Sequence, residues 1–491
     1  MSTEGLPQHP NLVLLITDQE RAPMHWPAGW ADEHLPSRRR LLRHGISFEH
    51  ATCNTSMCSP SRATFFTGTM PAQHRVTETL TYGGTFSAGE TVLDPSRPNL
   101  ATMLRAAGYD VHYRGKWHLS KSEDGTEELT SEQIAAYGFD GWVGPDAGGD
   151  TRPSSFGAGR ADHDARYIAQ ALELLDELSS APRDRPFALV ISLINPHDVL
   201  AYPNGEWTED FTHDDIAGEI PLPPTIDEDL ASNFKPTAHE RLRQIANLAL
   251  GPITTDEQRA GYVNFYANLS QRIDAQIAPI VDRFYGPDGT PTQLGNDTIL
   301  VRFSDHGELA LSHGGMRQKA FNVYEETLRV PLIISNPHLC PGPRRSDAPA
   351  SLVDLMPTIA TLCHAEPPAG LRGADLTPII EDPEHGPVQD HVLFTFDDTR
   401  ASAASFKEPV AAANRIRAIR EARFKYARYF HADGAFPEEH EMYDLQEDPL
   451  ELHNLAHPEH PRYAEPAVVA ERERLAAKLA AAEDRNARAL A

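Results

Sequence analysis

Residues 11–19 read Asn-Leu-Val-Leu-Leu-Ile-Thr-Asp-Gln, an apolar run that ends on a carboxylate and an amide. A continuous run of this kind predicts a strand that is buried on both faces of a sheet. Similar runs recur at residues 187–194, 298–303 and 330–335. The run at 298–303 is also followed by polar residues, Asp305 and His306. These runs predict an α/β sheet covered by helices.

Helical periodicity lies between the predicted strands. Apolar residues recur every three or four positions in residues 167–178 and 261–284, which indicates helices that pack on the sheet. Residues 98–107 predict another helix, closed by Gly108, and an extended segment then leads to Arg114-Gly-Lys-Trp-His118. In open α/β sheets, ligands bind beyond the carboxyl ends of the strands. We therefore expect the polar clusters at 18–19, 114–118 and 305–306 to meet at one rim.

Composition excludes several classes of protein. The chain has 491 residues, with 40% hydrophobic residues and a net charge of −27. That composition is typical of a globular protein, and the lack of a basic block argues against nucleic acid as a partner. No stretch approaches the roughly 18 apolar residues that span a bilayer, and the run at 11–17 lacks the flanks of an export signal. The four scattered cysteines do not suggest a disulfide scaffold, so we expect a cytoplasmic protein with no membrane partner.

A stretch rich in Pro and acidic residues, 381–390, predicts a domain boundary. We expect a catalytic α/β domain over residues 1–385 and a smaller α+β domain over 386–491, with extended segments at 392–396 and 415–430 and a helix from about Pro466. Residues 201–251 are acidic and spotted with Pro, which indicates a surface excursion or part of a substrate-site rim.

Two kinds of residue pattern indicate chemistry. In Cys58-Ser-Pro-Ser-Arg62, a helix would place Arg62 on the same side as Cys58. A helix N-terminus beside a fixed cation suits sulfate or phosphate. The pairs Asp18-Gln19 and Asp305-His306 suit a hard divalent ion such as Ca²⁺ or Mg²⁺ better than a structural Zn²⁺. Taken alone, a strand-end Asp caps a helix and a lone Cys is a small buried hydrophobe.

A third set of residues carries positive charge or transfers protons. It comprises Lys116, His118, His197, His313 and Lys319. Together with a metal ion, these residues could neutralise a tetrahedral anion and supply acids and bases of suitable pKa.

In combination, these motifs resemble the type I sulfatases of the alkaline-phosphatase-like superfamily. Residues 58–62 match the family's Cys-x-Pro-x-Arg signature, and the likeness continues in the family's order. The further matching segments are 16–19, 115–118, 195–197, 304–307, Lys319 with 324–325, 443–445 and 448–449. The resemblance implies the sulfatase fold, in which helices flank a large mixed central sheet and a smaller C-terminal α+β domain with an antiparallel sheet follows.

The resemblance also implies a mechanism. In the family, the signature cysteine, here Cys58, is oxidised to formylglycine (3-oxoalanine) by a formylglycine-generating enzyme. The aldehyde hydrates to a geminal diol. One diol oxygen, polarised by the metal, attacks sulfur and expels the alcohol, and loss of a proton from the other hydroxyl then releases sulfate.

Site roles carry over position by position as implications of the same resemblance. Asp18, Gln19, Asp305 and His306, completed by the modified Cys58 or the substrate, correspond to ligands of one divalent ion. We expect Ca²⁺, with Mg²⁺ or Mn²⁺ as alternatives. Arg62 corresponds to the residue that stabilises the diol, and Lys116 and Lys319 to those that hold sulfate oxygens. His118 corresponds to the base for sulfate release, and His197, with Lys319, to the group that protonates the leaving oxygen. His313 is expected near the bound substrate.

Departures from the family pattern leave alternatives open. Gln19 and His306 stand where many sulfatases have Asp and Asn, and the related phosphonate monoester and phosphodiester hydrolases share these variants. Lys116 and His118 favour a sulfatase, so we expect hydrolysis of a sulfate monoester to an alcohol and inorganic sulfate, with phosphonate or phosphodiester hydrolysis as the alternative. A different hypothesis is that Cys58 stays unmodified and the protein binds sulfated ligands without turnover. A zinc site built on Cys53 and Cys58 is disfavoured, because the spacing is loose and no paired motif follows.

The sequence leaves the substrate alcohol open between aryl, choline-like and sugar alcohols. Residues 120–160 and 201–251 are expected to form the loops that select it. Trp117, Trp142 and Trp207 are candidate pocket residues, although loop aromatics more often serve packing. The sequence leaves the oligomeric state undetermined.

Overall fold

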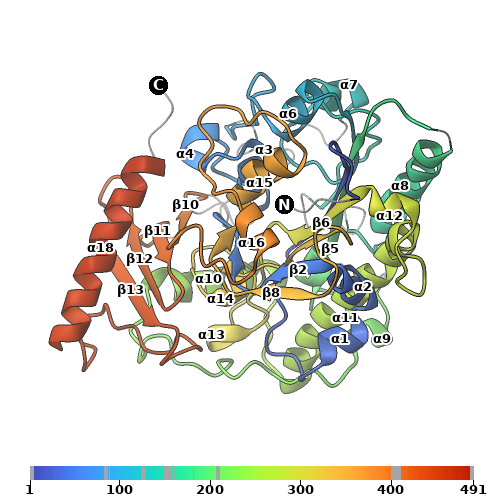
Figure 1. Cartoon of the computed structure of the whole chain (residues 1–491). Helices are drawn as coiled ribbons and strands as arrows, with labels where there is room; N and C mark the ends of the chain where they lie inside the picture. Colours follow the sequence, from blue (N-terminus) through green and yellow to red (C-terminus); the bar gives the residue numbers. More distant parts are fainter. Residues whose placement is uncertain are drawn as a thin grey trace.

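The computed structural model describes residues 5–81, 87, 89–122, 129–148, 156–159, 161–180, 182–205, 211–399 and 411–486. Its centre is a seven-stranded mixed sheet with the strand order β4-β5-β1-β6-β7-β2-β8 (Figure 1). In that order the strands are Asp110–Gly115, Phe187–Pro196, Asn11–Asp18, Thr298–Ser304, Leu332–Ser335, Gly45–Phe48 and Arg344–Ser346. The four runs predicted as strands thus correspond to β1, β5, β6 and β7.

Strands β4, β5, β1 and β6 run parallel to one another. Leu14 of β1 lies opposite Val190 of β5 and Val301 of β6. This register brings the carboxyl ends of neighbouring strands to one edge. Strand β7 is antiparallel to β6 and to β2, and β8 is parallel to β2, so the sheet is mixed as predicted.

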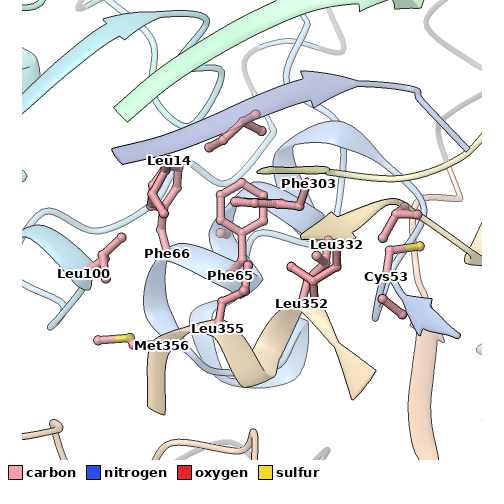
Figure 2. Close-up of a cluster of buried hydrophobic side chains, with 14 of the residues drawn as sticks. Leu14, Cys53, Phe65, Phe66, Leu100, Phe303, Leu332, Leu352, Leu355 and Met356 are labelled. Atoms are coloured by element: carbon pink, nitrogen blue, oxygen red, sulfur yellow. The ribbon is translucent and has the colours of Figure 1, made fainter. Parts of the chain in front are cut away.

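Helices cover both faces of the central sheet. Val13 and Leu15 point into one core with α2 (Pro36–Arg43), α8 (His163–Ser179) and α11 (Asp256–Tyr285). Leu14 and Ile16 point into the opposite core with α3 (Cys58–Thr67), α6 (Leu100–Ala106) and α15 (Leu355–Leu362), where Phe65 and Phe66 of α3 pack beneath β1 and β6 (Figure 2). Alternation along a strand buried on both faces explains why β1 is apolar at every position from 12 to 16.

Shorter elements complete this unit. They are α1 (Trp30–His34), β3 (Ala51–Thr52) paired with β9 (Ala350–Ser351), α4 (Pro71–His74), α7 (Ser131–Ala135), a 3₁₀ helix at His197–Ala201, α9 (His213–Ile216), α10 (Thr237–Leu250), α12 (Gln293–Asn296), α13 (Ser312–Gly315), α14 (Glu325–Leu328), a 3₁₀ helix at Leu352–Asp354 and α16 (Thr377–Glu381).

A four-stranded antiparallel sheet follows, with the order β10-β11-β12-β13. Its strands are Val392–Phe396, Arg415–Arg420, Phe424–Phe430 and Glu439–Asp444, and α18 (Pro466–Asn486) lies along it (Figure 1).

Both faces of this second sheet are buried. On one face, Ile419 and Met442 share an apolar cluster with Leu475 of α18. On the other, Phe394 and Tyr443 join the core beneath the central sheet. The predicted C-terminal sheet and terminal helix are confirmed, whereas the boundary at residues 385/386 stays a prediction. Within the described residues, no helix is long and apolar enough to cross a bilayer.

Candidate active site

The carboxyl ends of the four parallel strands supply the polar residues of one buried site. Asp18 ends β1, Asp305 follows β6, Lys116 follows β4 and His197 follows β5. Each of these side chains is at most 5% exposed. The structure therefore brings together the three clusters that were expected to meet at one rim.

Helix α3 carries Cys58 and Arg62 to this edge. The helix begins at Cys58, and its Pro60 lies in the first turn, where a missing N–H breaks no helical hydrogen bond. The Ser61 hydroxyl donates to the Asp305 carbonyl at 2.6 Å, which docks the start of the helix on the end of β6. Arg62 follows Cys58 by about one turn and is fully buried.

The Arg62 guanidinium ties the strand ends together. Its Nε donates to Asp305 Oδ2 at 3.1 Å and its Nη2 to Asp18 Oδ2 at 3.2 Å. Its Nη1 donates to the Lys116 carbonyl at 3.1 Å and to the Ser192 hydroxyl at 2.8 Å. Burial opposes the charge of Arg62, but the two aspartates outweigh it and raise the pKa. Arg62 is therefore a permanent cation inside the site.

Four potential metal ligands face one another beside this cation. They are Asp18, Cys58, Asp305 and His306, whose ligand atoms all lie within 4.8 Å of one another. His306 Nδ1 is 3.1 Å from the Gly307 carbonyl and must carry the proton if it donates there, so Nε2 offers its lone pair to the group. Burial favours the neutral form of Asp18, but the positive charges of Lys116 and Arg62 hold its pKa well below the usual value. An ionised carboxylate and an oriented imidazole fit a divalent cation.

Gln19, the fifth expected ligand, has its side-chain amide between two charges. Its Oε1 accepts from Lys319 Nζ, and its Nε2 donates to Glu308 Oε2 at 2.5 Å. Glu308 is fully buried and also accepts from the Tyr262 hydroxyl at 2.8 Å and from the Gln318 N–H at 2.9 Å. Glu308 therefore sets which way the Gln19 amide points, with its oxygen toward Lys319. Sequence reasoning missed Glu308, because nothing local separates it from other acidic residues.

Lys116 and His118 have fixed positions after β4. Lys116 Nζ donates to Asp18 Oδ2 and, at 2.8 Å, to the Gly148 carbonyl. Burial lowers the pKa of Lys116, but Asp18 outweighs this effect and the pKa is raised. Asp146, a residue that the sequence did not single out, accepts from the Trp117 and His118 N–H groups, both at 2.8 Å. Burial, reinforced by Lys116, holds the pKa of His118 well below its usual value, so the imidazole is neutral.

His197 is the second neutral imidazole of the site. Burial lowers its pKa far below 6.5, and the positive charges of Lys116 and Lys319 contribute in the same direction, although Asp18 opposes them. Its Nδ1 is buried and has no hydrogen-bond partner among the described residues. A neutral imidazole with an uncommitted nitrogen can accept or relay a proton.

Both ring nitrogens of His313 contact carboxylates. Its Nδ1 lies 2.7 Å from Glu228 Oε2 and its Nε2 lies 3.3 Å from Glu326 Oε2, while the ring stacks on Tyr324 at 3.5 Å. Burial opposes its charge, but the carboxylates raise its pKa to about 9. The substrate-binding role of His313 stays a prediction. Glu228 belongs to the 201–251 segment, so the described part of that segment contacts His313.

Two of the three tryptophans proposed as pocket residues lie in the hydrophobic core. Trp117 and Trp142 are buried, and Trp117 packs against Tyr113, so both serve the core. Trp207 lies outside the described residues, as do residues 123–128, 149–155 and 160 of the predicted 120–160 loop.

The cysteines do not pair. All four are free and buried. Cys53 Sγ donates to the Thr327 carbonyl at 3.6 Å, and it does not belong to the group of ligand atoms found among the described residues. This agrees with the judgement that Cys53 and Cys58 do not form a zinc motif.

Comparison with known proteins adds independent findings. A family model described as Sulfatase matches residues 10–365, and one described as N-sulphoglucosamine sulphohydrolase, C-terminal, matches residues 313–480. A choline-sulfatase of Rhizobium meliloti (strain 1021) is 29% identical over 482 residues, which cover 92% of this chain and 83% of that protein.

Solved structures share the fold. A 2-O GAG sulfatase superposes with a TM-score of 0.69 at 21% identity, covering 97% of this chain and 93% of the other. A phosphonate monoester hydrolase from Silicibacter pomeroyi superposes with a TM-score of 0.70 at 22% identity, covering 97% and 96%. These likenesses confirm the predicted architecture.

Proposed function

The chain belongs to the sulfatase family and is a sulfuric ester hydrolase, and we propose that it cleaves a sulfate monoester with Cys58 converted to formylglycine and a divalent ion beside it. The observation that carries this proposal is the position of Cys58. Its Sγ lies 3.7 Å from Asp18 Oδ1 and 3.2 Å from His306 Nε2, within the group of potential metal ligands. A hydroxylated side chain at this position would lie beside an ion held by Asp18, Asp305 and His306.

The proposed ion is Ca²⁺, with Mg²⁺ or Mn²⁺ as alternatives. Asp18, Asp305 and His306 would hold it, and the amide oxygen of Gln19 is the further candidate ligand. Carboxylate and amide oxygens suit hard cations, whereas a single imidazole is compatible with any of the three. The bound ion would supply Lewis acidity and, with formylglycine, a nucleophilic oxygen.

The protein's own residues account for binding and proton movement. Arg62, Lys116 and Lys319 surround the site with positive charge, which supports the binding of a sulfate group and of the charge that develops on its oxygens. His118 and His197 are both neutral, because burial lowers the pKa of each. A neutral imidazole can take a proton from a hydroxyl, which is the role proposed for His118. His197 would act with Lys319, passing a proton from the lysine ammonium to the leaving oxygen.

Initial rates on 4-nitrophenyl sulfate and on a phenyl phosphonate ester test this proposal. The protein is co-expressed with a formylglycine-generating enzyme, the proposed maturation partner, and compared with Cys58→Ala. Intact-mass analysis of the peptide that contains Cys58 reports the conversion. We expect preference for the sulfate ester and loss of turnover in the variant, whose buried site is otherwise unchanged.

Two results would count against the proposal. Equal rates in wild type and Cys58→Ala would exclude the formylglycine mechanism. Preference for the phosphonate ester would favour the alternative activity, which the shared fold permits because a tetrahedral anion among cations does not by itself distinguish sulfur from phosphorus.

A cytoplasmic location remains our proposal. The four free, buried cysteines support it, because thiols persist in a reducing compartment. Fractionation of the native host, with detection of the protein in the cytoplasmic or the exported fraction, tests it.

A further inference from the structure

The candidate active site has a different donor set before Cys58 is modified. In the unconverted chain, the fourth donor is a thiol sulfur beside two carboxylates and one imidazole. We propose that the unconverted chain binds a zinc-class ion through Asp18, Cys58, Asp305 and His306. Conversion of Cys58 to formylglycine would then change the preference of the same site from an ion that binds sulfur, such as Zn²⁺, to one that binds oxygen, such as Ca²⁺. Only this second statement rests on the proposed function.

The spacing of the donor atoms supports a four-coordinate ion. Cys58 Sγ lies 3.2 Å from His306 Nε2 and 3.7 Å from Asp18 Oδ1. His306 Nε2 lies 3.6 Å from Asp18 Oδ1 and 3.6 Å from Asp305 Oδ1. Zinc bonds of about 2.0–2.3 Å at tetrahedral angles place ligand atoms roughly 3.3–3.6 Å apart. The observed separations scatter around that range, so small side-chain movements suffice for a tetrahedral site.

The surrounding contacts orient each donor toward the same point. Arg62 and Lys116 bind Oδ2 of Asp18, and Arg62 also binds Oδ2 of Asp305, so the two Oδ1 atoms face the ion. Oδ1 of Asp305 also accepts from the Gln19 N–H at 3.2 Å and keeps a second lone pair for the ion. The contact from His306 Nδ1 to the Gly307 carbonyl leaves Nε2 as the donor. Outer contacts of this kind fix the ligands of most protein metal sites.

The charge and proton balance is also favourable. Two carboxylates, one thiolate and Zn²⁺ sum to −1, and the adjacent Arg62 and Lys116 cations offset that charge. The Cys58 thiol loses its proton to the buffer when the metal–sulfur bond forms, and no oxidant or reductant is needed. Ca²⁺ is a poor competitor in this state, because it requires about six to eight oxygen ligands and gains little from sulfur.

A spectroscopic titration tests the proposal without measuring activity. The full chain is produced without the formylglycine-generating enzyme, intact mass confirms the thiol, and Co²⁺ serves as the probe. We expect one equivalent of Co²⁺ to produce a thiolate-to-cobalt charge-transfer band, which Zn²⁺ abolishes by displacement and excess Ca²⁺ does not. Cys58→Ser should lack the band and bind Zn²⁺ about 100-fold more weakly.

The matched control is Cys53→Ser. Cys53 is a buried cysteine outside the ligand group, so this variant should keep the band. Thermal unfolding of each variant without metal checks that it is folded. Calorimetry of Zn²⁺ binding in two buffers of different ionisation enthalpy gives a second readout, in which the wild type should release one proton more than Cys58→Ser.

The outcomes separate this inference from the proposed function. Absence of the band, or equal Zn²⁺ affinity in wild type and Cys58→Ser, would overturn the zinc site whatever the converted enzyme does. A second sample with converted Cys58 should show no band and should bind Ca²⁺. If that sample still binds Zn²⁺ as tightly as the thiol form, the proposed change of preference is wrong although the thiol site stands.

Discussion

The buried charge of His313 leads to a quantitative prediction about stability and pH. Its side chain is 1% exposed, and Glu326 and Glu228 overcome the effect of burial to raise its pKa from 6.5 to about 9. A tenfold change in proton affinity is worth about 1.4 kcal/mol, so the bound proton contributes about 3 kcal/mol to the free energy of unfolding. Because the folded state binds this proton more tightly, the contribution is complete below about pH 6.5 and is lost as the pH rises through about 9.

Equilibrium urea denaturation of wild type and His313→Gln at about pH 6 and about pH 10 measures this contribution. We expect the variant's deficit in unfolding free energy to be about 3 kcal/mol larger at the lower pH, since only the wild type loses a buried cation between the two conditions. Titrating groups that do not interact with His313 are common to both proteins and cancel in the difference.

His239→Gln is the matched control. His239 is also buried against Tyr324, but burial and the nearby Lys235 hold its pKa well below 6.5, so its ring is neutral throughout this range. Its deficit should therefore not change with pH. Parallel pH profiles for wild type and His313→Gln would refute the reasoning, because they would show that His313 binds no extra proton on folding.

Three further predictions concern other parts of the molecule. Arg62→Lys should destabilise the fold by about 3–5 kcal/mol and abolish turnover, because one ammonium cannot bridge Asp18 and Asp305. Denaturation measures the stability and initial rates measure the turnover, and near-wild-type values would contradict the bridging role. Glu308→Gln should weaken metal binding about 10- to 100-fold, because the Gln19 amide loses the carboxylate that orients it. Competition with a chelator measures the metal affinity, and an unchanged affinity would leave Glu308 a purely structural role. Leu475→Ala removes a fully buried side chain of α18 and should lower the free energy of unfolding by about 2–5 kcal/mol. Denaturation measures this loss. The rate per folded molecule should not change, and a changed rate would mean that α18 influences the site.

The local pattern of apolar and polar residues was sufficient to predict the strands and the helix that carry the site. The apolar runs predicted β1, β5 and β6, because strands covered on both faces must be apolar at nearly every position. Parallel pairing of neighbouring strands then brings their carboxyl ends together, so Asp18 and Asp305 could be expected at one edge before any contact was known. The cysteine signature likewise indicated that a helix would place Arg62 on the same side as Cys58, and the structure begins that helix at Cys58.

The sequence by itself therefore determined the strands that carry the site, the residue types at their ends and the likeness to the sulfatases. Only the tertiary structure decided which charges meet: Lys319 with Gln19 across 300 residues, Arg62 with Asp305 across 243, and His313 between Glu228 and Glu326. Such partners depend on sheet crossovers and loop paths, which local periodicity does not encode. Charge and protonation follow from those contacts, because burial and neighbouring charge together set each pKa. The physical reason for the division is that secondary structure is governed by nearby residues, whereas the electrostatics of a buried site is governed by whatever the fold brings within a few ångströms.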